Sequence, residues 1–171
     1  MRVLLIAALS ADGYIGADED HRATSWTTKA DTRFFMTKTK ELGTVIMGRR
    51  TFATFNKPLK DRRLIIYTHH PDSITVDGVE ATAEEPKELI ERLDQEGVKG
   101  IAICGGTSIY TQFMNAGIVD ELYLTVMPKL FGGGVLLFDH LVNKDLELLS
   151  ADKLDDQNSV LLHYKLASQL N

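Results

Sequence analysis

The amino-acid sequence predicts one α/β domain, residues 1–171, built on a central mixed, mostly parallel sheet with helices on both faces. Short aliphatic and β-branched runs recur along the chain, and helical stretches separate several of them, an alternation typical of parallel sheets. The length of 171 residues is that of a single ordinary domain. The last two apolar runs instead flank a short polar segment, which predicts a C-terminal antiparallel hairpin.

Five apolar runs have the length and composition of β-strands. They cover residues 2–9, 43–48, 63–68, 100–105 and 121–127. The hairpin is expected to pair residues 146–154 with residues 159–167 through a turn at 155–158. The three glycines at 132–134 indicate a local loop or bulge.

Three stretches carry apolar residues at helical spacing. They are residues 28–41, 84–96 and 107–117. Pro86 lies near the start of the second stretch, where proline is tolerated because its missing N–H would have no partner. Gly117 is the expected stop of the third.

The amino-acid composition indicates a folded globular protein. Hydrophobic residues make up 44% of the chain and charged residues 25%, values of a folded globular protein rather than a disordered one. The formal net charge of −5 gives no overall basic surface for nucleic acid. The apolar run near the start, residues 3–9, is far shorter than a membrane helix. We therefore expect a cytoplasmic protein that binds neither nucleic acid nor membranes.

The sequence shows no pattern typical of a metal site or of a catalytic nucleophile. Cys104 is the one cysteine, so an intramolecular disulfide and a zinc site of several cysteines are both excluded. The five histidines show no metal-binding spacing, and no serine or cysteine stands in a nucleophile motif. The sequence therefore predicts neither a metal site nor nucleophilic catalysis.

Two turns have the composition of phosphate sites. Gly105 and Gly106 connect an apolar strand to a helix start, where free N–H groups and the helix dipole favour an anion. The segment Gly48–Thr51 also follows a strand and carries two arginines, whose guanidinium groups bind phosphate with two hydrogen bonds. The alternatives are an ordinary turn capped by Thr107 or Ser108 and a solvated basic turn.

An acidic residue and aromatic residues share the start of the first helix. Asp31 follows Thr28 by three residues, as in a capping box, and Phe35 lies one turn further on the same face. A carboxylate beside an aromatic ring, with Trp26 close by, would bind a flat heterocycle that can be protonated. The alternative is a helix cap with core aromatic residues. Arg62 could anchor a ligand carboxylate or belong to a charged loop.

Six segments together resemble dihydrofolate reductase, in the order in which that family has them. They are IAALSADGYIG at 6–16, WTTKADTRFF at 26–35, VIMGRRTF at 45–52, KPLKDRRLII at 57–66, CGGTSIYTQF at 104–113 and DELYLT at 120–125. The resemblance implies a dihydrofolate-reductase-like fold. It also implies reduction of 7,8-dihydrofolate to tetrahydrofolate by hydride transfer from NADPH, a reaction of one-carbon metabolism.

The resemblance implies a role for each matching residue. Asp31 would hold the pterin and favour protonation of its imine nitrogen, Thr125 would hydrogen-bond Asp31 or the pterin, and Arg62 would bind the α-carboxylate of the glutamate tail. Trp26 would order the site and a bound water, and Tyr110 completes the implied catalytic set. The implied substrate-binding residues are Ile6, Ala7, Asp31, Phe35, Phe55, Leu59, Arg62, Cys104 and Thr125. The implied NADPH-binding residues are Ala8, Ile15, Gly16, Gly48, Arg49, Arg50, Thr51, Tyr67, Thr68, His69, Cys104, Gly105, Gly106, Thr107, Ser108, Ile109 and Tyr110.

Other functions remain open at this point. The segment MPKLFGGGVLLF at 127–138 resembles the reductase domain of riboflavin biosynthesis, which implies a pyrimidine or another heterocycle as the substrate. A non-catalytic nucleotide-binding module would bind NADPH without turnover. The polar segment 17–25 is longer than the family's usual loop and is expected to order on ligand binding. The resemblance is compatible with a monomer or a homodimer.

Overall fold

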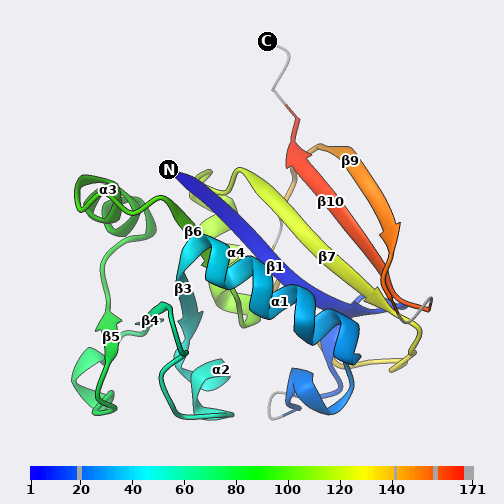
Figure 1. Ribbon diagram of the computed structural model, residues 1–171, viewed down its shortest axis with the longest axis horizontal. Coiled ribbons are helices and arrows are strands. Elements are labelled where there is room, and N and C mark those ends of the chain that lie inside the picture. The colour runs from blue at the N-terminus through cyan, green and yellow to red at the C-terminus, as the bar shows by residue number, and fades with distance from the viewer. Residues whose placement is uncertain (19–20, 141, 156–157, 168–171) are drawn as a thin grey trace.

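A computed structural model describes the chain except for residues 19–20, 141, 156–157 and 168–171 (Figure 1). Its centre is an eight-stranded sheet in the order β5-β4-β3-β6-β1-β7-β10-β9. The strands are β1 (Arg2–Ser10), β3 (Gly43–Gly48), β4 (Arg63–Tyr67), β5 (Val79–Thr82), β6 (Gly100–Ile103), β7 (Glu121–Met127), β9 (Leu146–Lys153) and β10 (Val160–Leu166). The six strands from β5 to β7 are parallel to their neighbours, and β10 is antiparallel to β7 and β9. The predicted mixed, mostly parallel sheet is confirmed.

Helices cover both faces of the sheet, as the alternation of elements predicts. They are α1 (Lys29–Leu42), α2 (Arg49–Ala53), α3 (Pro86–Gln95) and α4 (Thr107–Asn115), with short 3-10 turns η1 (Ala23–Ser25) and η2 (Pro71–Ser73). Leu4 and Ile6 of β1 pack in the core layer that holds α1 and α2, and Val3, Leu5 and Ala7 pack in the layer of α3 and α4. This alternation explains the continuous apolar runs, because a strand buried on both faces needs apolar residues at every position.

The helix boundaries shift by one or two residues from those predicted. Helix α1 begins after Thr28, whose side chain accepts a hydrogen bond from the Asp31 N–H. It ends at Leu42, and Gly43 follows as its C-cap with a φ of 78°. Helix α3 begins at Pro86 rather than at residue 84, with Glu85 extended before it. The residue before a proline avoids the helical region because it would clash with the proline ring.

Three short strands go beyond what the sequence predicts. The sequence of β5, VEAT, carries too few apolar residues to indicate a strand, and it becomes one by pairing with β4 at the sheet edge. Strands β2 (Tyr14–Gly16) and β8 (Val135–Leu136) form a separate antiparallel pair. Their pairing joins segments more than a hundred residues apart, which local periodicity cannot indicate.

The C-terminal hairpin has the predicted strands, β9 and β10. The centre of its predicted turn, residues 156–157, lies outside the described residues. Residues 132–134 form a loop between β7 and β8, as expected. Within the described chain, no helix combines the length and the apolar character needed to cross a membrane.

Candidate active site

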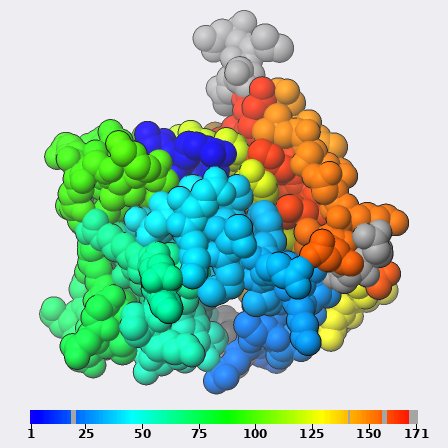
Figure 2. All heavy atoms as spheres, viewed as in Figure 1, coloured from blue at the N-terminus to red at the C-terminus, as the bar shows by residue number. Residues whose placement is uncertain are grey.

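A cleft of about 1490 Å³ opens at the carboxyl ends of strands β1, β3, β4 and β6. Ligands of open parallel sheets bind at this edge, because the loops that follow the strands converge there. The space-filling view shows a hollow between the segment around η1, in blue, and α2 with the chain that follows it, in cyan-green (Figure 2). The cleft is larger than a usual drug-sized pocket of roughly 300–1,000 Å³, so it has room for two ligands side by side.

The glycine turn after β6 brings two strand ends together on one side of the cleft. The Gly48 N–H donates to the Gly105 carbonyl oxygen at 2.6 Å. A Cβ on Gly48 would lie 2.9 Å from the Ile109 side chain, and a Cβ on Gly105 would lie 2.9 Å from the Tyr110 ring. These two positions therefore require glycine, because any side chain would push the turn away from α4.

Helix α4 begins directly behind this turn, with Gly106 as its N-cap and no side-chain cap from the described residues. The predicted alternative, a turn capped by Thr107 or Ser108, is wrong. The Thr107 hydroxyl instead donates to the Leu136 carbonyl oxygen of β8 at 2.6 Å. The first turn of this helix lines the cleft, and a helix start that no side chain caps favours an anion there.

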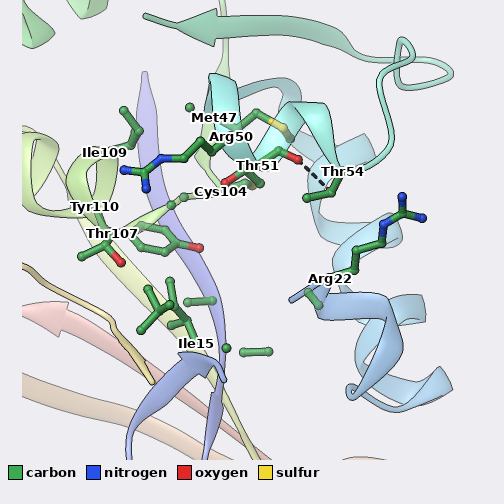
Figure 3. Close-up of a pocket in the computed structure, with 18 of the residues that line it drawn as sticks. Ile15, Arg22, Met47, Arg50, Thr51, Thr54, Cys104, Thr107, Ile109 and Tyr110 are labelled. Carbon is green, nitrogen blue, oxygen red and sulfur yellow. Dashed lines mark hydrogen bonds between the residues drawn. The ribbon is translucent and has the colours of Figure 1, made fainter. Parts of the chain in front are cut away.

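The basic turn after β3 lies beside the start of α4, where a Cβ on Gly106 would lie 3.4 Å from the Thr51 Oγ1. Arg49 and Arg50 are exposed at the start of α2, and Thr51 follows them. Figure 3 shows Arg50 and Thr51 on the same side as Ile109 and Thr107. His69 and His70 line the same end of the cleft after β4. Arg49 and Arg50 thus bring two positive charges to this end of the cleft, although the whole chain carries a net charge of −5.

Tyr110 and Cys104 form the buried floor of the cleft. The Tyr110 hydroxyl donates to the Ile6 carbonyl oxygen of β1 at 2.7 Å. Burial raises the pKa of Tyr110 well above its ordinary value, and the nearby Cys104 and Asp31 raise it further. Burial also raises the pKa of the Cys104 thiol well above its ordinary value. Both groups therefore stay protonated and neutral near neutral pH.

Asp31 lies in the first turn of α1, lines the cleft and is only 8% exposed. Its backbone N–H donates to the Thr28 hydroxyl at 3.2 Å, which confirms the N-cap predicted from the sequence. The helix dipole favours a negative charge at this position. Phe35 lies one turn later and also lines the cleft, so a carboxylate and an aromatic ring face the same space.

Trp26 lies beside the cleft and does not line it. Its ring packs edge-on against Phe131, with the ring centres 5.1 Å apart. Its Nε1 is buried and has no hydrogen-bond partner among the residues described. A buried donor of this kind usually binds ordered water, so the predicted water-binding role of Trp26 fits this geometry and stays a prediction.

Arg62 also lies behind the lining residues rather than among them. Its Nη1 donates to the Thr39 hydroxyl of α1 at 2.8 Å, and its Nε donates to the Lys60 carbonyl oxygen at 3.1 Å. Burial lowers the pKa of this guanidinium. The side chain is therefore held in one orientation by neutral groups, and its predicted carboxylate partner stays a prediction.

Thr125, like Trp26 and Arg62, is a predicted site residue that does not line the cleft. It is 1% exposed in β7, beside Ala8 of β1. Its strand lies next to β1, whose residues Ile6, Ala7 and Ala8 line the cleft. The implied contact of Thr125 with Asp31 or the pterin stays a prediction.

All other site residues that are predicted from the sequence line this cleft. They are Ile6, Ala7, Ala8, Ile15, Gly16, Asp31, Phe35, Gly48, Arg49, Arg50, Thr51, Phe55, Leu59, Tyr67, Thr68, His69, Cys104, Gly105, Gly106, Thr107, Ser108, Ile109 and Tyr110. The structure thus brings together residues from six separate segments of the chain.

Several further lining residues are not indicated by the sequence. Met47 is the strand residue before Gly48, and Thr54 directly follows α2, so both adjoin segments that the sequence does indicate. Arg22 and Lys57 stand in polar loops, where a charged residue is ordinarily solvated and carries no signal. Val135 and Leu136 reach the cleft through the pairing of β8 with β2.

Known proteins match this chain over almost its whole length. A family model described as dihydrofolate reductase matches residues 2–168. The chain is 32% identical to dihydrofolate reductase type 3 of Salmonella typhimurium over 171 residues, which covers 99% of each chain. It is 29% identical to the uncharacterized protein YwjB of Bacillus subtilis over 175 residues, which covers 95% of this chain and 97% of that protein.

Two solved structures show how widely this fold is shared. Dihydrofolate reductase from Enterococcus faecalis, complexed with NADP(H), has a TM-score of 0.75 and 24% identity over 98% of this chain and 97% of its own. A diaminohydroxyphosphoribosylaminopyrimidine deaminase/5-amino-6-(5-phosphoribosylamino)uracil reductase from Thermotoga maritima has a TM-score of 0.78 and 17% identity. That match covers 97% of this chain and 56% of the other.

The fold and the cleft thus define an α/β protein with a mixed, mostly parallel sheet and a ligand-sized cleft at the carboxyl ends of its parallel strands. The chain belongs to the dihydrofolate reductase family.

Proposed function

We propose that this protein reduces 7,8-dihydrofolate to 5,6,7,8-tetrahydrofolate with NADPH as the hydride donor. The observation that carries the proposal is the placement of Asp31. It is a nearly buried carboxylate at a helix start, in a cleft that is also lined by a glycine turn and by arginines that would bind an anionic dinucleotide. The proposal includes a cytoplasmic protein in one-carbon metabolism, whose product is the reduced folate.

The residues present fit NADPH. The glycine turn at 105–106 allows a ligand to approach the backbone, and the first turn of α4 offers N–H groups to a phosphate. Arg49, Arg50 and Thr51 would hold phosphate groups from the neighbouring turn after β3. When bound, the reduced nicotinamide supplies the hydride.

Asp31 would hold the pterin through its amino and ring N–H groups. An ionised carboxylate in a poorly solvated site stabilises a neighbouring cation, so it favours the substrate with a protonated imine nitrogen. Protonation makes the adjacent ring carbon a better hydride acceptor. Raising the protonated fraction of the substrate in this way is a form of acid–base assistance, a class of effect worth roughly 10²–10⁴-fold in rate.

The walls of the cleft would hold the two rings in contact and exclude water. Ile6, Ala7 and Phe35 present apolar surface to the substrate side. Tyr110 is held by its hydrogen bond to the Ile6 carbonyl oxygen, which keeps the floor of the cleft in place. Close placement of the reacting rings lowers the barrier because orientation is established on binding.

A second candidate substrate is a pyrimidine of the riboflavin pathway. The segment 127–138 carries the resemblance, and part of it forms β8, where Val135 and Leu136 line the cleft. The likeness to the Thermotoga maritima structure concerns the fold. Asp31 could serve this chemistry as well, because an aminouracil also presents N–H groups to a carboxylate.

The two substrates can be separated by one assay. The purified protein is mixed with NADPH and either dihydrofolate or 5-amino-6-(5-phosphoribosylamino)uracil, and the loss of reduced-nicotinamide absorbance is followed. The proposal predicts rapid loss with dihydrofolate. Turnover of the uracil compound instead would assign the second candidate. Binding of NADPH without turnover of either compound would indicate a nucleotide-binding module.

A further inference from the structure

Met36 is an exposed methionine in the wall of the cleft, and the reaction proposed above gives it no role. It follows Phe35 in α1, lines the cleft and is 37% exposed. A thioether that solvent reaches is open to oxidation, which turns a flexible apolar side chain into a polar one. An oxidant that enters the cleft therefore meets the Met36 sulfur.

The other methionines lack this combination of exposure and position. Met47 also lines the cleft, but it is buried in β3. Met114 and Met127 are buried and do not line the cleft. Met1 is exposed at the amino terminus, outside the cleft. Among the five methionines of the chain, Met36 alone is both exposed and in the cleft wall.

The Met36 sulfur contacts a guanidinium group. The Arg62 Nη1 donates to the Met36 Sδ at 3.5 Å and to the Thr39 hydroxyl at 2.8 Å. Thr39 is buried, whereas Met36 lines the cleft, so the sulfur is where this guanidinium meets the cleft. A thioether sulfur is only a weak hydrogen-bond acceptor, so in the reduced protein it leaves Arg62 open to a better partner.

We propose that Met36 is a redox-sensitive site, at which oxidation by a peroxide engages Arg62 and weakens ligand binding in the cleft. The sulfur attacks one oxygen of hydrogen peroxide, and an S–O bond forms as the O–O bond breaks. The other oxygen leaves as water with both protons. The sulfur is oxidised to the sulfoxide by two electrons, and the peroxide is reduced. This inference rests on the proposed function and deepens it, because it concerns the regulation of the same cleft.

The sulfoxide oxygen would change what Arg62 binds. Oxidation puts a polar oxygen on an atom that is already within hydrogen-bond reach of the Arg62 Nη1. Hydrogen bonds with a charged donor are roughly twice as strong as neutral ones, so the guanidinium binds the new oxygen. In the described part of the chain, Arg62 is 9% exposed and donates to neutral groups. A poorly solvated cation of this kind favours an anion as partner, and the sulfoxide competes with it.

Peptide mapping by mass spectrometry tests the site in the intact protein after mild treatment with hydrogen peroxide. We expect one added oxygen at Met36 and at the exposed Met1, and none at the three buried methionines. Met36→Leu is the resistant variant and Met47→Leu the matched control, because both replace a cleft methionine with a residue of similar volume. Oxidation of Met47 ahead of Met36, or no oxidation of Met36, would overturn the inference.

Kinetics before and after peroxide show what the oxidation does, with each protein compared with itself. In the wild type and Met47→Leu, KM for dihydrofolate should rise roughly 5- to 20-fold, the size of one lost charge-assisted hydrogen bond, with kcat little changed. The acid-free analogue 6-methyl-7,8-dihydropterin should respond much less. Met36→Leu, which keeps Met1, should not respond. Methionine sulfoxide reductases should restore the original KM. An equal response of Met36→Leu, or equal effects on both substrates, would contradict the role of Met36.

Ligand binding separates this inference from the proposed function. Trp26 is the one tryptophan of the chain, so its fluorescence follows the titration of folate and pterin without turnover. Met36→Gln mimics the oxidised side chain without peroxide, because its amide oxygen is an acceptor. If the wild type reduces no substrate but folate binds more weakly after oxidation and to Met36→Gln, the proposed function fails and the redox-sensitive site stands. Equal folate binding before and after oxidation, or no folate binding by the untreated protein, overturns it.

Discussion

Replacing Gly105 with alanine tests the packing that holds the glycine turn against the floor of the cleft. Gly105 has a φ of +89°, and a Cβ there would lie 2.9 Å from the Tyr110 ring. That ring cannot move away freely, because its hydroxyl donates to the Ile6 carbonyl oxygen at 2.7 Å. The left-handed backbone costs an alanine roughly 1–2 kcal/mol, and overpacking costs roughly 1–3 kcal/mol more.

Gly117→Ala is the matched control. Gly117 has a φ of +70°, and a Cβ added there would meet no described atom within 4 Å, so it shares the backbone cost without the collision. Urea unfolding followed by circular dichroism should show a loss of about 2–5 kcal/mol for Gly105→Ala and about 1–2 kcal/mol for Gly117→Ala. NADPH affinity should fall in the first variant and stay unchanged in the second. Equal losses of stability would refute the packing argument.

Three further substitutions test other parts of the structure. Arg92→Gln removes the main hydrogen-bond donor that holds the pKa of Glu84 below its ordinary value of 4.5. A carboxyl group whose pKa is lowered in the folded protein stabilises the fold above about pH 4.5, and this stabilisation is lost as the pH falls through the pKa of the folded state. The difference in Tm between wild type and variant should therefore shrink below about pH 4.5. A constant difference down to pH 3 would contradict this linkage. Thr39→Val removes the hydroxyl that accepts from Arg62, and urea unfolding should show a loss of roughly 1–3 kcal/mol for the unsatisfied guanidinium, together with a higher KM for dihydrofolate. An unchanged KM would argue against Arg62 as a tail anchor. Tyr110→Phe leaves a buried carbonyl of β1 without its donor and should cost about 1–3 kcal/mol in the same assay, whereas a neutral result would mean that water replaces the hydroxyl.

The elements that could be predicted are those whose signal is local. Strands β1, β3, β4, β6 and β7 are buried on both faces, and their continuous apolar runs are visible without any tertiary information. Helical spacing alone places the start of α3 two residues too early, because it leaves out the effect of Pro86 on the residue before it. The pairing of β2 with β8, in contrast, depends on contacts between distant segments, and no local pattern of the chain contains them.

The candidate site likewise contains residues that local sequence patterns indicate and residues that only the folded chain brings together. The sequence indicates the glycines and arginines at strand ends and the acidic residue in the first turn of a helix. Their residue types suit ligand binding, and they stand at strand ends or helix starts that are visible in the sequence. Arg22 and Lys57 could not be predicted in this way, because only the folded chain brings these loop residues to the cleft. The sequence allows Thr107 as a helix cap, but its hydroxyl reaches a carbonyl oxygen of β8, a partner that is 29 residues away in the chain.

The role of Asp31 as the group that favours the protonated substrate is the central claim, and one measurement tests it most directly. Rates of NADPH oxidation with dihydrofolate are compared for wild type and Asp31→Asn between pH 5 and pH 8. Asparagine has a similar shape and no charge, so we predict a loss of roughly 10²–10⁴-fold near neutral pH. The loss should shrink as the pH falls, because more substrate is then protonated in solution. A variant with near-normal turnover at neutral pH, or with the same loss at every pH, would contradict the account.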